Sequence, residues 1–419
     1  MTTAKINVFM HSLEPSALKL SGKNNTENVE LFQSQLNKYP ERALFLAENN
    51  DYIILNHYPD KDYLDYLTDM DIGTRKILSP TNQEKSLSEN VLKDKPLLKF
   101  LQTLGTEIIL HPYISLKHEA KIAKIIGATL NGSPPELTKK VNSKIYIPTL
   151  LQKLALPIPE YEIANSLSVI NTAKKLRNKY EKIIVIGNDT YGGLAVWLII
   201  NEETFNSFKD DVNLSNPKEQ FLVEKMYDVM CSPNIQYQIY PNSIQALGIT
   251  DQILDEKLKY HGNTSALSTK QLDKIRRDSY RICEYLQCEG FRGILGIDFI
   301  ETTQGKIFVV DINGRANTSS FGLRVIHKLF PDSFPKKHFK ILSNINIGQK
   351  ATFAELIDII GKKNIFDKQK GQGILPYNTG FLQWGKFSAI VIANTQQEIN
   401  QLLTLNDEWF SIRGSSFFQ

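Results

Sequence analysis

Three oxygen-bearing side chains interrupt an otherwise apolar stretch near residue 300. Asp298 stands in the run 293–300, and Asp311 and Asn313 stand at the end of the run 307–313. Carboxylate and amide oxygens are ligands that Mg²⁺ prefers, usually together with substrate phosphates and water. These residues therefore predict a magnesium site at which phosphate groups could be bound.

For these side chains to meet, the stretch must fold as a β-hairpin. Its branched and aromatic residues favour strands, and the polar segment 301–305 supplies a turn that ends in glycine. Asp311 and Asn313 are two residues apart and so share one face of a strand. A turn of 302–305 would place Asp298 opposite Val309, with Asp311 as its diagonal neighbour about 7–8 Å away. The alternative, a solvated sheet face, is disfavoured by the apolar residues between them, which indicate a covered sheet.

Composition sets the class of protein. A chain of 419 residues suggests two or three domains, and 42% hydrophobic and 22% charged residues are typical of a folded soluble protein. A net charge of +4 is too balanced to indicate nucleic-acid binding. The N-terminus lacks a signal-peptide pattern, and the apolar run 194–200 is too short to cross a bilayer. Three cysteines favour free thiols in a reducing compartment, so we expect a cytoplasmic protein. From the charge and the short apolar run we expect neither a nucleic-acid nor a membrane partner.

The first third of the chain alternates between strand-like and helix-like patterns. We expect strands near 4–10, 43–47, 52–56, 76–80 and 106–110, and helices near 27–38, 60–68 and 87–104. Such alternation is typical of a parallel, Rossmann-like unit. No Gly-x-Gly-x-x-Gly occurs in it, so no dinucleotide is predicted. The segment 132–135, Gly-Ser-Pro-Pro, marks the end of this unit.

A glycine-rich loop at 187–193 separates two predicted strands further along the chain, at 182–186 and 194–201. Backbone N–H groups of such a loop can lie close to phosphates, although the pattern alone is more typical of an ordinary hairpin. The other expected elements are helices at 136–154 and 269–287, the latter with Ser268 as N-cap, strands at 220–227 and 244–250, a loop at 259–263 and a C-terminal α/β extension.

Taken in chain order, these parts resemble the ATP-grasp superfamily over residues 136–325. Asn142-Ser-Lys144 and the segment 154–159, Leu-Ala-Leu-Pro-Ile-Pro, are similar to its opening helix. The glycine loop follows, and then the segment 223–227, which resembles the hinge strand. Asp298 and Asp311-Ile-Asn-Gly-Arg315 resemble the D/E-x-N-x-R signature, and the N-terminal unit resembles a pre-ATP-grasp domain.

The resemblance implies an α/β (α+β) fold in three parts. A Rossmann-like pre-ATP-grasp domain would occupy 1–132, a small lobe with the lid loop 133–220, and a large lobe with the metal site and the C-terminal extension 221–419. Within the superfamily, the arrangement, including Tyr260-His-Gly-Asn263 before the long helix, looks most like the amino-acid and peptide ligases.

Around the nucleotide, the resemblance implies a role for each candidate residue. Lys144 would contact the ATP phosphates as a point charge, the alternative being an ordinary solvated helix lysine. Gly192 and Gly193 would let the lid close over the triphosphate. The adenine edge would be formed largely by backbone groups of Glu224, Lys225 and Met226.

The hairpin would act on the phosphates and on the acyl group. Asp298, Asp311 and Asn313 would hold one or two Mg²⁺ ions, with Mn²⁺ as a substitute, against the phosphates of ATP. Arg315 would face an acyl-phosphate, for which a guanidinium fork is suited. The alternative for Arg315 is a structural salt bridge.

The implied reaction is the ATP-dependent joining of a carboxylate to an amine through an acyl-phosphate, with release of ADP and phosphate. The partners would be small molecules, amino acids or peptides, and the chain could form a homodimer. One departure is the absence of the family's second lysine, because Ile186-Gly187 stands in its place and Lys182 lies too far back. A second is aspartate at 311, where glutamate is commoner. Two other functions therefore stay open: a nucleotide-binding regulatory protein on a degenerate scaffold, and a kinase or dikinase.

Overall fold

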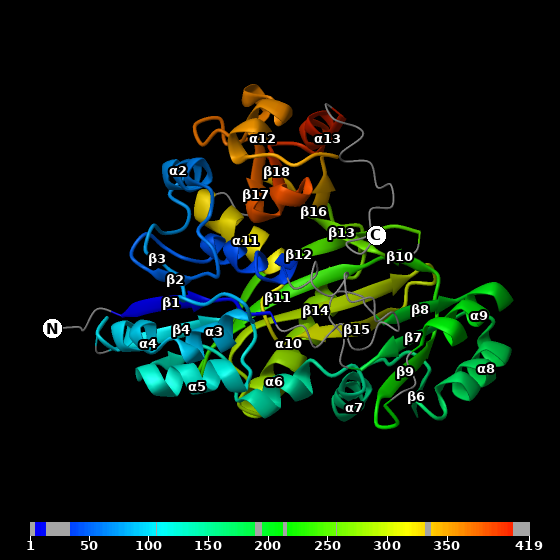
Figure 1. The fold of residues 1–419 in the computed structure, drawn as a ribbon. Coiled ribbons are helices and arrows are strands. Elements are labelled where there is room, and N and C mark those ends of the chain that lie inside the picture. The colour runs from blue at the N-terminus through cyan, green and yellow to red at the C-terminus, as the bar shows by residue number, and fades with distance from the viewer. Residues whose placement is uncertain are drawn as a thin grey trace.

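Three β-sheets organise the chain (Figure 1). The computed structural model describes residues 5–13, 34–105, 107–188, 195–212, 216–256, 258–331 and 337–404. The first sheet lies in the N-terminal part, the second forms a small lobe, and the third runs through the centre of the molecule into the C-terminal part. The predicted order of an α/β domain followed by two further lobes is confirmed.

The N-terminal sheet is parallel, with the strand order β3-β2-β1-β4-β5. Its strands are β1 (Ile6–Met10), β2 (Tyr52–Ile54), β3 (Ile77–Leu78), β4 (Ile108–Pro112) and β5 (Thr129–Leu130). The helices of this part are η2 (Tyr39–Phe45), α2 (Lys61–Asp69), α3 (Leu87–Lys93), α4 (Lys95–Gln102) and α5 (Lys117–Ile126). An apolar cluster that includes Val91, Leu101 and Ile122 packs α3, α4 and α5 against one face.

Two expectations for this part are wrong, and one lies largely outside the described residues. The segment 43–47 is no strand, since residues up to Phe45 belong to the 3₁₀ helix η2, which begins with Pro40 in its first turn. Its buried apolar run looks the same in a strand and in a buried helix. The single helix 87–104 is two helices, because Asp94 ends α3 and caps α4, accepting from the backbone of Leu97 at 2.9 Å. Most of the helix expected at 27–38 falls within 14–33, which the structure does not describe.

The small lobe is an antiparallel sheet with the order β6-β9-β7-β8. Its elements are β6 (Tyr161–Asn165), α8 (Val169–Tyr180), β7 (Ile183–Gly187), β8 (Val196–Ile199), α9 (Glu202–Asp211) and β9 (Gln220–Lys225). The strands expected on both sides of the glycine loop are confirmed. The last strand of this sheet, β9, ends at Lys225. The predicted domain limits at 132 and 220 stay a prediction.

The helix expected at 136–154 is broken in the middle. The structure has α6 (Pro135–Val141) and α7 (Tyr146–Lys153). The residues between them form a turn that carries Lys144, so this lysine does not lie on a helix.

The large sheet has nine strands, with the order β10-β14-β11-β12-β13-β16-β18-β17 and β15 paired to β14. Its strands are β10 (Val229–Cys231), β11 (Pro233–Ile239), β12 (Ile244–Leu254), β13 (Tyr260–Thr264), β14 (Gly293–Thr302), β15 (Ile307–Asn313), β16 (His338–Asn346), β17 (Gly373–Tyr377) and β18 (Lys386–Ala393). Its helices are α10 (Leu272–Cys288), α11 (Thr318–Leu329), α12 (Phe353–Ile360), η3 (Lys362–Asn364), η4 (Thr379–Trp384) and α13 (Gln396–Thr404).

The loop expected at 259–263 is in fact the strand β13, which pairs with β12 and β16. Gly262 makes this pairing possible: a Cβ there would lie 1.9 Å from the backbone oxygen of Ile341. The polar residues around Gly262 led to the prediction of a loop. The sequence does not show that the backbone of β16 approaches Gly262 closely enough to pair with it. The helix expected at 269–287 is confirmed as α10, but its N-cap is Gln271 and not Ser268.

The faces of the large sheet differ in character. Alternate residues, among them Ile235, Leu295 and Ile297, pack on α7 and α10 in an apolar cluster. The opposite face carries buried polar residues, including Asn234 and Gln236. This face is therefore polar but covered.

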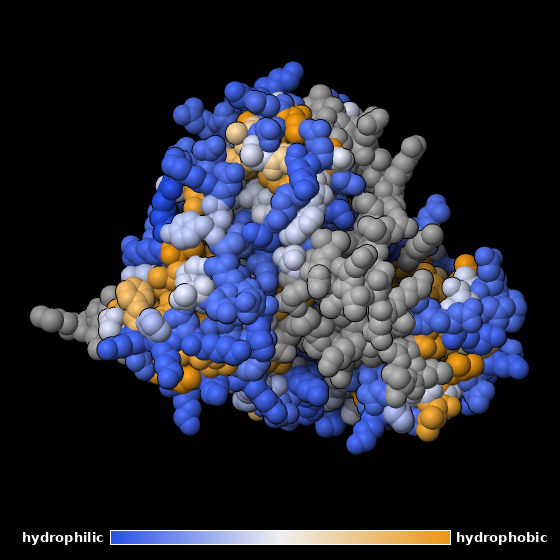
Figure 2. All heavy atoms as spheres, viewed as in Figure 1, coloured by the Kyte–Doolittle hydropathy of each residue, from blue (hydrophilic) through white to orange (hydrophobic). Residues whose placement is uncertain are grey.

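The surface and the cysteines complete the description of the fold. Among the residues that are coloured, Figure 2 shows a mostly hydrophilic surface in this view, with apolar patches on the N-terminal part and on the small lobe. Cys231, Cys283 and Cys288 are free thiols, as expected. Over the ranges that the structure describes, no helix combines the length and the apolar character that crossing a bilayer would require.

Candidate active site

The hairpin formed by β14 and β15 brings the three predicted ligands together on the polar face. Asp298 lies directly opposite Asp311, and Asn313 lies opposite Gly296. The direct pairing corrects the diagonal placement expected from an even turn. A β-bulge follows the Phe299–Val309 pair and makes Val310 an extra residue of β15. Without the bulge, Asp298 and Asp311 would lie on opposite faces of the sheet.

Hydrogen bonds hold these side chains close to one another. The Nδ2 of Asn313 donates to Asp298 Oδ2 at 3.2 Å and to Asp311 Oδ2 at 3.3 Å. On the other side, Asn234 of β11 donates its Nδ2 to Asp298 Oδ1. Gln236 and Ser319 bond to Asn234 Oδ1, both at 2.7 Å, and so fix its amide. Asn234 is thus a site residue that sequence reasoning missed, and its only signal is a polar residue in the strand that pairs with β14.

The chemistry of this donor set suits a hard divalent cation. Burial, and then the neighbouring Asp311 carboxylate, raise the pKa of Asp298 to about 7. A buried carboxylate that faces a second carboxylate would be stabilised in its ionised form by a bound cation, and Mg²⁺ prefers such oxygens. Rotating the Asn313 amide by half a turn would present its oxygen instead of its NH₂. In the described ranges no three His, Cys, Asp or Glu residues are grouped to hold a metal, and the ligand role of Asn313 beside the two aspartates stays a prediction.

Lys144 joins this cluster from the turn between α6 and α7. Its Nζ forms an ion pair with Asp311 Oδ1, and its side chain is only 15% exposed. It is therefore not a solvated helix lysine. Burial raises the pKa of Glu224 to about 7, while Lys144 acts to lower it. Lys144 thus lies between a carboxylate of the large sheet and a buried carboxylate of the small lobe.

The residues around Lys144 fix the turn to both lobes. Asn142 Oδ1 accepts from the backbone of Gly314 at 3.1 Å, directly after the hairpin. Ser143 Oγ donates at 2.8 Å to Oδ1 of Asn188, which also accepts from the backbone of Ile145 at 3.1 Å. Asn188 directly follows β7, next to the position where the family's second lysine was expected. Sequence reasoning missed its role, although a polar residue at that strand end was a usable signal.

The segment predicted to meet adenine forms the end of β9. Glu224 is buried between β6 and β7. The backbone N–H of Lys225 donates to Glu160 O at 2.9 Å, and that of Met226 donates to Lys182 O at 3.1 Å. An adenine edge here would have to use other groups of this segment, and the role of the three residues stays a prediction.

The predicted lid glycines, Gly192 and Gly193, lie outside the described residues, which break off after 188 and resume at 195. Their role also stays a prediction.

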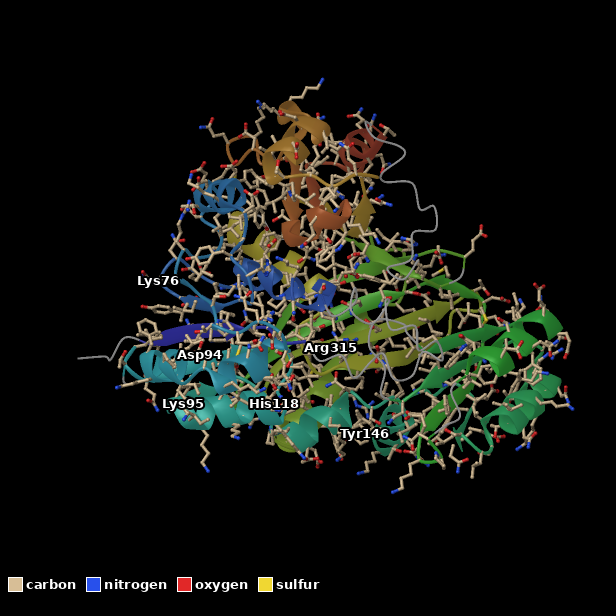
Figure 3. All side chains as sticks on the ribbon, viewed as in Figure 1. Lys76, Asp94, Lys95, His118, Tyr146 and Arg315 are labelled. Atoms are coloured by element: carbon tan, nitrogen blue, oxygen red, sulfur yellow. The ribbon has the colours of Figure 1, made fainter. Side chains whose placement is uncertain are left out.

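Arg315 lies where the N-terminal part meets the large sheet, near the centre of the view in Figure 3. Its Nη1 donates to Tyr113 Oη at 2.9 Å and to Ala316 O at 3.1 Å. Tyr113 directly follows β4 of the N-terminal sheet, so Arg315 connects the hairpin to the first part of the chain. Burial alone would raise the pKa of Tyr113, but Arg315 and Arg42 together lower it below its ordinary value. The acyl-phosphate role of Arg315 stays a prediction.

Comparisons with known proteins agree with this architecture. A family model described as "Pre ATP-grasp domain" matches residues 40–128. A second, described as "L-aspartate--L-methionine ligase, ATP grasp", matches residues 160–313 and so ends on the last residue of β15.

One curated relative and two solved structures are distantly similar to the chain. The butirosin acyl-carrier protein--L-glutamate ligase of Niallia circulans is 23% identical over 297 residues, which are 68% of this chain and 66%, just under two thirds, of the relative. The fold is similar to N5-carboxyaminoimidazole ribonucleotide synthetase from Thermus thermophilus, with a TM-score of 0.59, 8% identity and coverage of 98% of this chain and 100% of that one. It is also similar to the Staphylococcus aureus N5-carboxyaminoimidazole synthetase complexed with ADP, with a TM-score of 0.57, 13% identity and 96% coverage of both chains.

Proposed function

Because the chain belongs to the ATP-grasp superfamily and carries a pre-ATP-grasp domain, we propose that it is an ATP-dependent ligase that joins a carboxylate to an amine. The observation that carries this proposal is the cluster of Lys144, Asp298, Asp311 and Asn313, in which a cation of the chain faces paired carboxylates. Such a set suits Mg-ATP, whose phosphates and metal need both kinds of partner. The ADP complex of a protein of similar fold supports the same nucleotide here.

An amino acid is the proposed acyl donor. The matching family model is named for the joining of L-aspartate and L-methionine, and the relative from Niallia circulans for L-glutamate. Both names contain a dicarboxylic amino acid. We therefore propose L-aspartate or L-glutamate as the first substrate to test.

The residues of the chain would share the work of positioning. Lys144 would contact the phosphates, and Asp298, Asp311 and Asn313 would hold Mg²⁺, or Mn²⁺ in its place. The bound metal would neutralise negative charge on the phosphates of ATP. Arg315 would orient the substrate carboxylate through its guanidinium fork.

The reaction then needs no protein nucleophile. A carboxylate oxygen of the donor attacks the γ-phosphorus in line, an O–P bond forms, and ADP leaves. The amine attacks the carbonyl carbon of the acyl-phosphate, phosphate leaves, and the amide nitrogen loses its proton to solvent. ADP and phosphate are the products besides the amide.

Product analysis tests this proposal directly. The protein is incubated with Mg-ATP, L-methionine and L-aspartate labelled with ¹⁸O in its carboxylates. We expect ADP and an ¹⁸O-containing phosphate, because an acyl-phosphate transfers one carboxylate oxygen to the phosphate. AMP and pyrophosphate as products would rule out the acyl-phosphate.

The variant Asp311→Asn tests the metal cluster. It removes a carboxylate that pairs with Lys144 and faces Asp298, so we expect turnover to fall on the order of 100-fold or more. Asp228→Asn is the matched control, since Asp228 is 77% exposed and only pairs with Lys182 at 3.5 Å. Turnover within twofold of the wild type in a folded Asp311→Asn protein would show that the metal assignment is wrong.

A nucleotide-binding regulatory protein is the second candidate. It is favoured by the absence of a second lysine at the end of the strand before the glycine loop. Calorimetric titration separates the two functions. Tight binding of Mg-ATP without turnover over a panel of amino acids and peptides would favour this candidate.

A further inference from the structure

A buried arginine of the N-terminal part is the feature that the proposed reaction does not yet use. Arg42 lies on η2 and is only 8% exposed. Its guanidinium carbon lies 4.8 Å from the ring centre of Tyr39, 4.6 Å from that of Tyr113 and 4.8 Å from that of Phe321. Three aromatic rings thus surround a cation that water hardly reaches.

No carboxylate among the described residues forms an ion pair with Arg42, and its Nε has no hydrogen-bond partner there. The adjacent Glu41 is directed elsewhere, towards His57 and Thr379. Buried charges in proteins are normally paired, because an unpaired one is strongly unfavourable. The cation–π contacts and a hydrogen bond to Tyr113 offset part of this cost. No residue that the structure describes supplies the anion that a guanidinium group is shaped to bind.

The described residue His11, which lies in the same aromatic cluster as Arg42, carries no negative charge either. His11, at the end of β1, is 1% exposed, and its ring lies 5.7 Å from Tyr113 and 5.6 Å from Phe321. Its Nδ1 has no partner among the residues that the structure describes. Burial, and then Arg42, lower the pKa of His11 well below its ordinary value. The cluster therefore contains cationic and neutral groups only.

Tyr113 connects this cluster to the candidate active site. Its ring has Arg42 at 4.6 Å and Arg315 at 5.4 Å from its centre, so the two guanidinium carbons lie within about 10 Å of each other. Arg315 is partly exposed and forms the end of the cluster that solvent reaches. A small substrate bound at Arg315 could therefore extend a second anionic group towards Arg42.

We propose that Arg42 binds a carboxylate of the amino-acid substrate, namely the one that does not react, while the reacting carboxylate lies at Arg315. A guanidinium fork binds a carboxylate through two parallel hydrogen bonds, which gives both affinity and orientation. Arg42 is then a specificity-determining residue supplied by the N-terminal domain. This inference rests on the proposed ligase function.

The test compares L-aspartate with its two amides, L-asparagine and L-isoasparagine, as acyl donors. In the wild type we expect the amide that lacks the non-reacting carboxylate to be used far less well than L-aspartate. Arg42→Lys and Arg42→Met should raise the KM for L-aspartate about 10- to 100-fold, leave the KM for ATP within twofold, and abolish the preference over that amide. Arg75→Met is the matched control, because Arg75 is a half-exposed arginine of the same domain that pairs with Asp65.

Two outcomes would overturn the inference while the ligase function stands. One is an unchanged KM and amide preference in folded Arg42 variants. The other is an equal loss of affinity for ATP and L-aspartate, as expected from a general structural defect. If Arg42→Met does not fold, the KM for L-aspartate and the amide preference of Arg42→Lys decide.

If the wild type turns over no amino acid, the proposed function fails and the site is tested by binding alone. L-aspartate is titrated calorimetrically into the wild type and into Arg42→Lys. Weaker binding to the variant supports the site, and no binding to the wild type overturns it.

Discussion

Asp298 lies where the fold opposes its ionisation. Its pKa of about 7 in the folded protein is well above the value near 4 expected in an unfolded chain. Between these two values the folded state binds more protons than the unfolded state. The free energy of unfolding must therefore decrease as the pH rises through this window, by roughly 1 kcal/mol per pH unit from this group.

The variant Asp298→Asn should remove this contribution, because the amide does not titrate. We predict that in chelator-containing buffer the wild type loses stability relative to Asp298→Asn between pH 5 and pH 7, with little further change above pH 8. Urea unfolding of both proteins across this range measures the difference and cancels other titrating groups. Added Mg²⁺ should then stabilise the wild type more than the variant at pH 8. Parallel stability curves for the two proteins would contradict the prediction.

Among the single residues of the candidate site, the sequence predicted those that stand in one local motif. Asp298, Asp311 and Asn313 belong to one hairpin, and its apolar neighbours showed which residues pair. Arg42 and Tyr113 could not be predicted, because they are more than 200 residues away from Arg315 in the chain and neither stands in a recognisable pattern. Only the fold brings Tyr113 against both arginines. Their roles arise from burial and from the missing anion, which only tertiary structure shows.

The helix α11 packs on β16 at a glycine. A Cβ at Gly322 would lie 2.1 Å from Cδ1 and 2.5 Å from Cγ1 of Ile341. Alanine is otherwise the better helix former by about 1 kcal/mol. The two effects oppose each other, and the overlap should dominate because Ile341 is fully buried.

We predict that Gly322→Ala destabilises the protein by roughly 1–3 kcal/mol. The double variant Gly322→Ala with Ile341→Ala should be more stable than the sum of the two single changes predicts, since the shorter side chain makes room for the new methyl group. A double-mutant cycle by urea unfolding measures this coupling. Additive effects would show that α11 moves away from β16 without a penalty at Ile341.

The elements that sequence reasoning placed correctly are those with regular periodicity and clear ends. The strands β7 and β14 and the helix α10 are examples. The failures have separate physical causes: η2 is a buried apolar helix that looks like a strand, and β13 is a polar strand that depends on the close approach allowed at Gly262. The bulge at Val310 was also invisible, because a single extra residue leaves the hydrophobic pattern almost unchanged.

The first and last parts of the chain share one apolar core. Its members come from residues 9–77, from Tyr113 and Ile114, and from residues 316–399. The N-terminal sheet is thus covered on one face by α3, α4 and α5, and on the other by η2, α2 and the C-terminal part. This shared core fixes η2, and with it Arg42, relative to the hairpin that carries Arg315. Domain boundaries read from the sequence do not reveal such sharing, because burial between distant segments has no local pattern.

Glu41 is the polar centre of this interface. It is 1% exposed, and its carboxylate accepts from Thr379 Oγ1 at 2.8 Å and from the backbone of Gly380 at 3.2 Å, while His57 lies at 3.1 Å. A cavity of about 230 Å³ adjoins it. Glu41→Ala would leave these donors without their acceptor, so we predict a loss of roughly 3 kcal/mol of stability.

The loss should appear in both parts of the chain at once. In hydrogen-exchange mass spectrometry we expect Glu41→Ala to lower protection in η2 and equally in β17 and η4, which lie on the C-terminal side of the interface. Glu48→Ala is the matched control: Glu48 pairs across the same interface with Arg324 at 3.0 Å and Lys328 at 2.6 Å but is half exposed. Its removal should cost about 1 kcal/mol or less. If Glu41→Ala loosened η2 alone, the two parts would be stabilised separately, and the position of Arg42 beside Arg315 would not depend on their shared core.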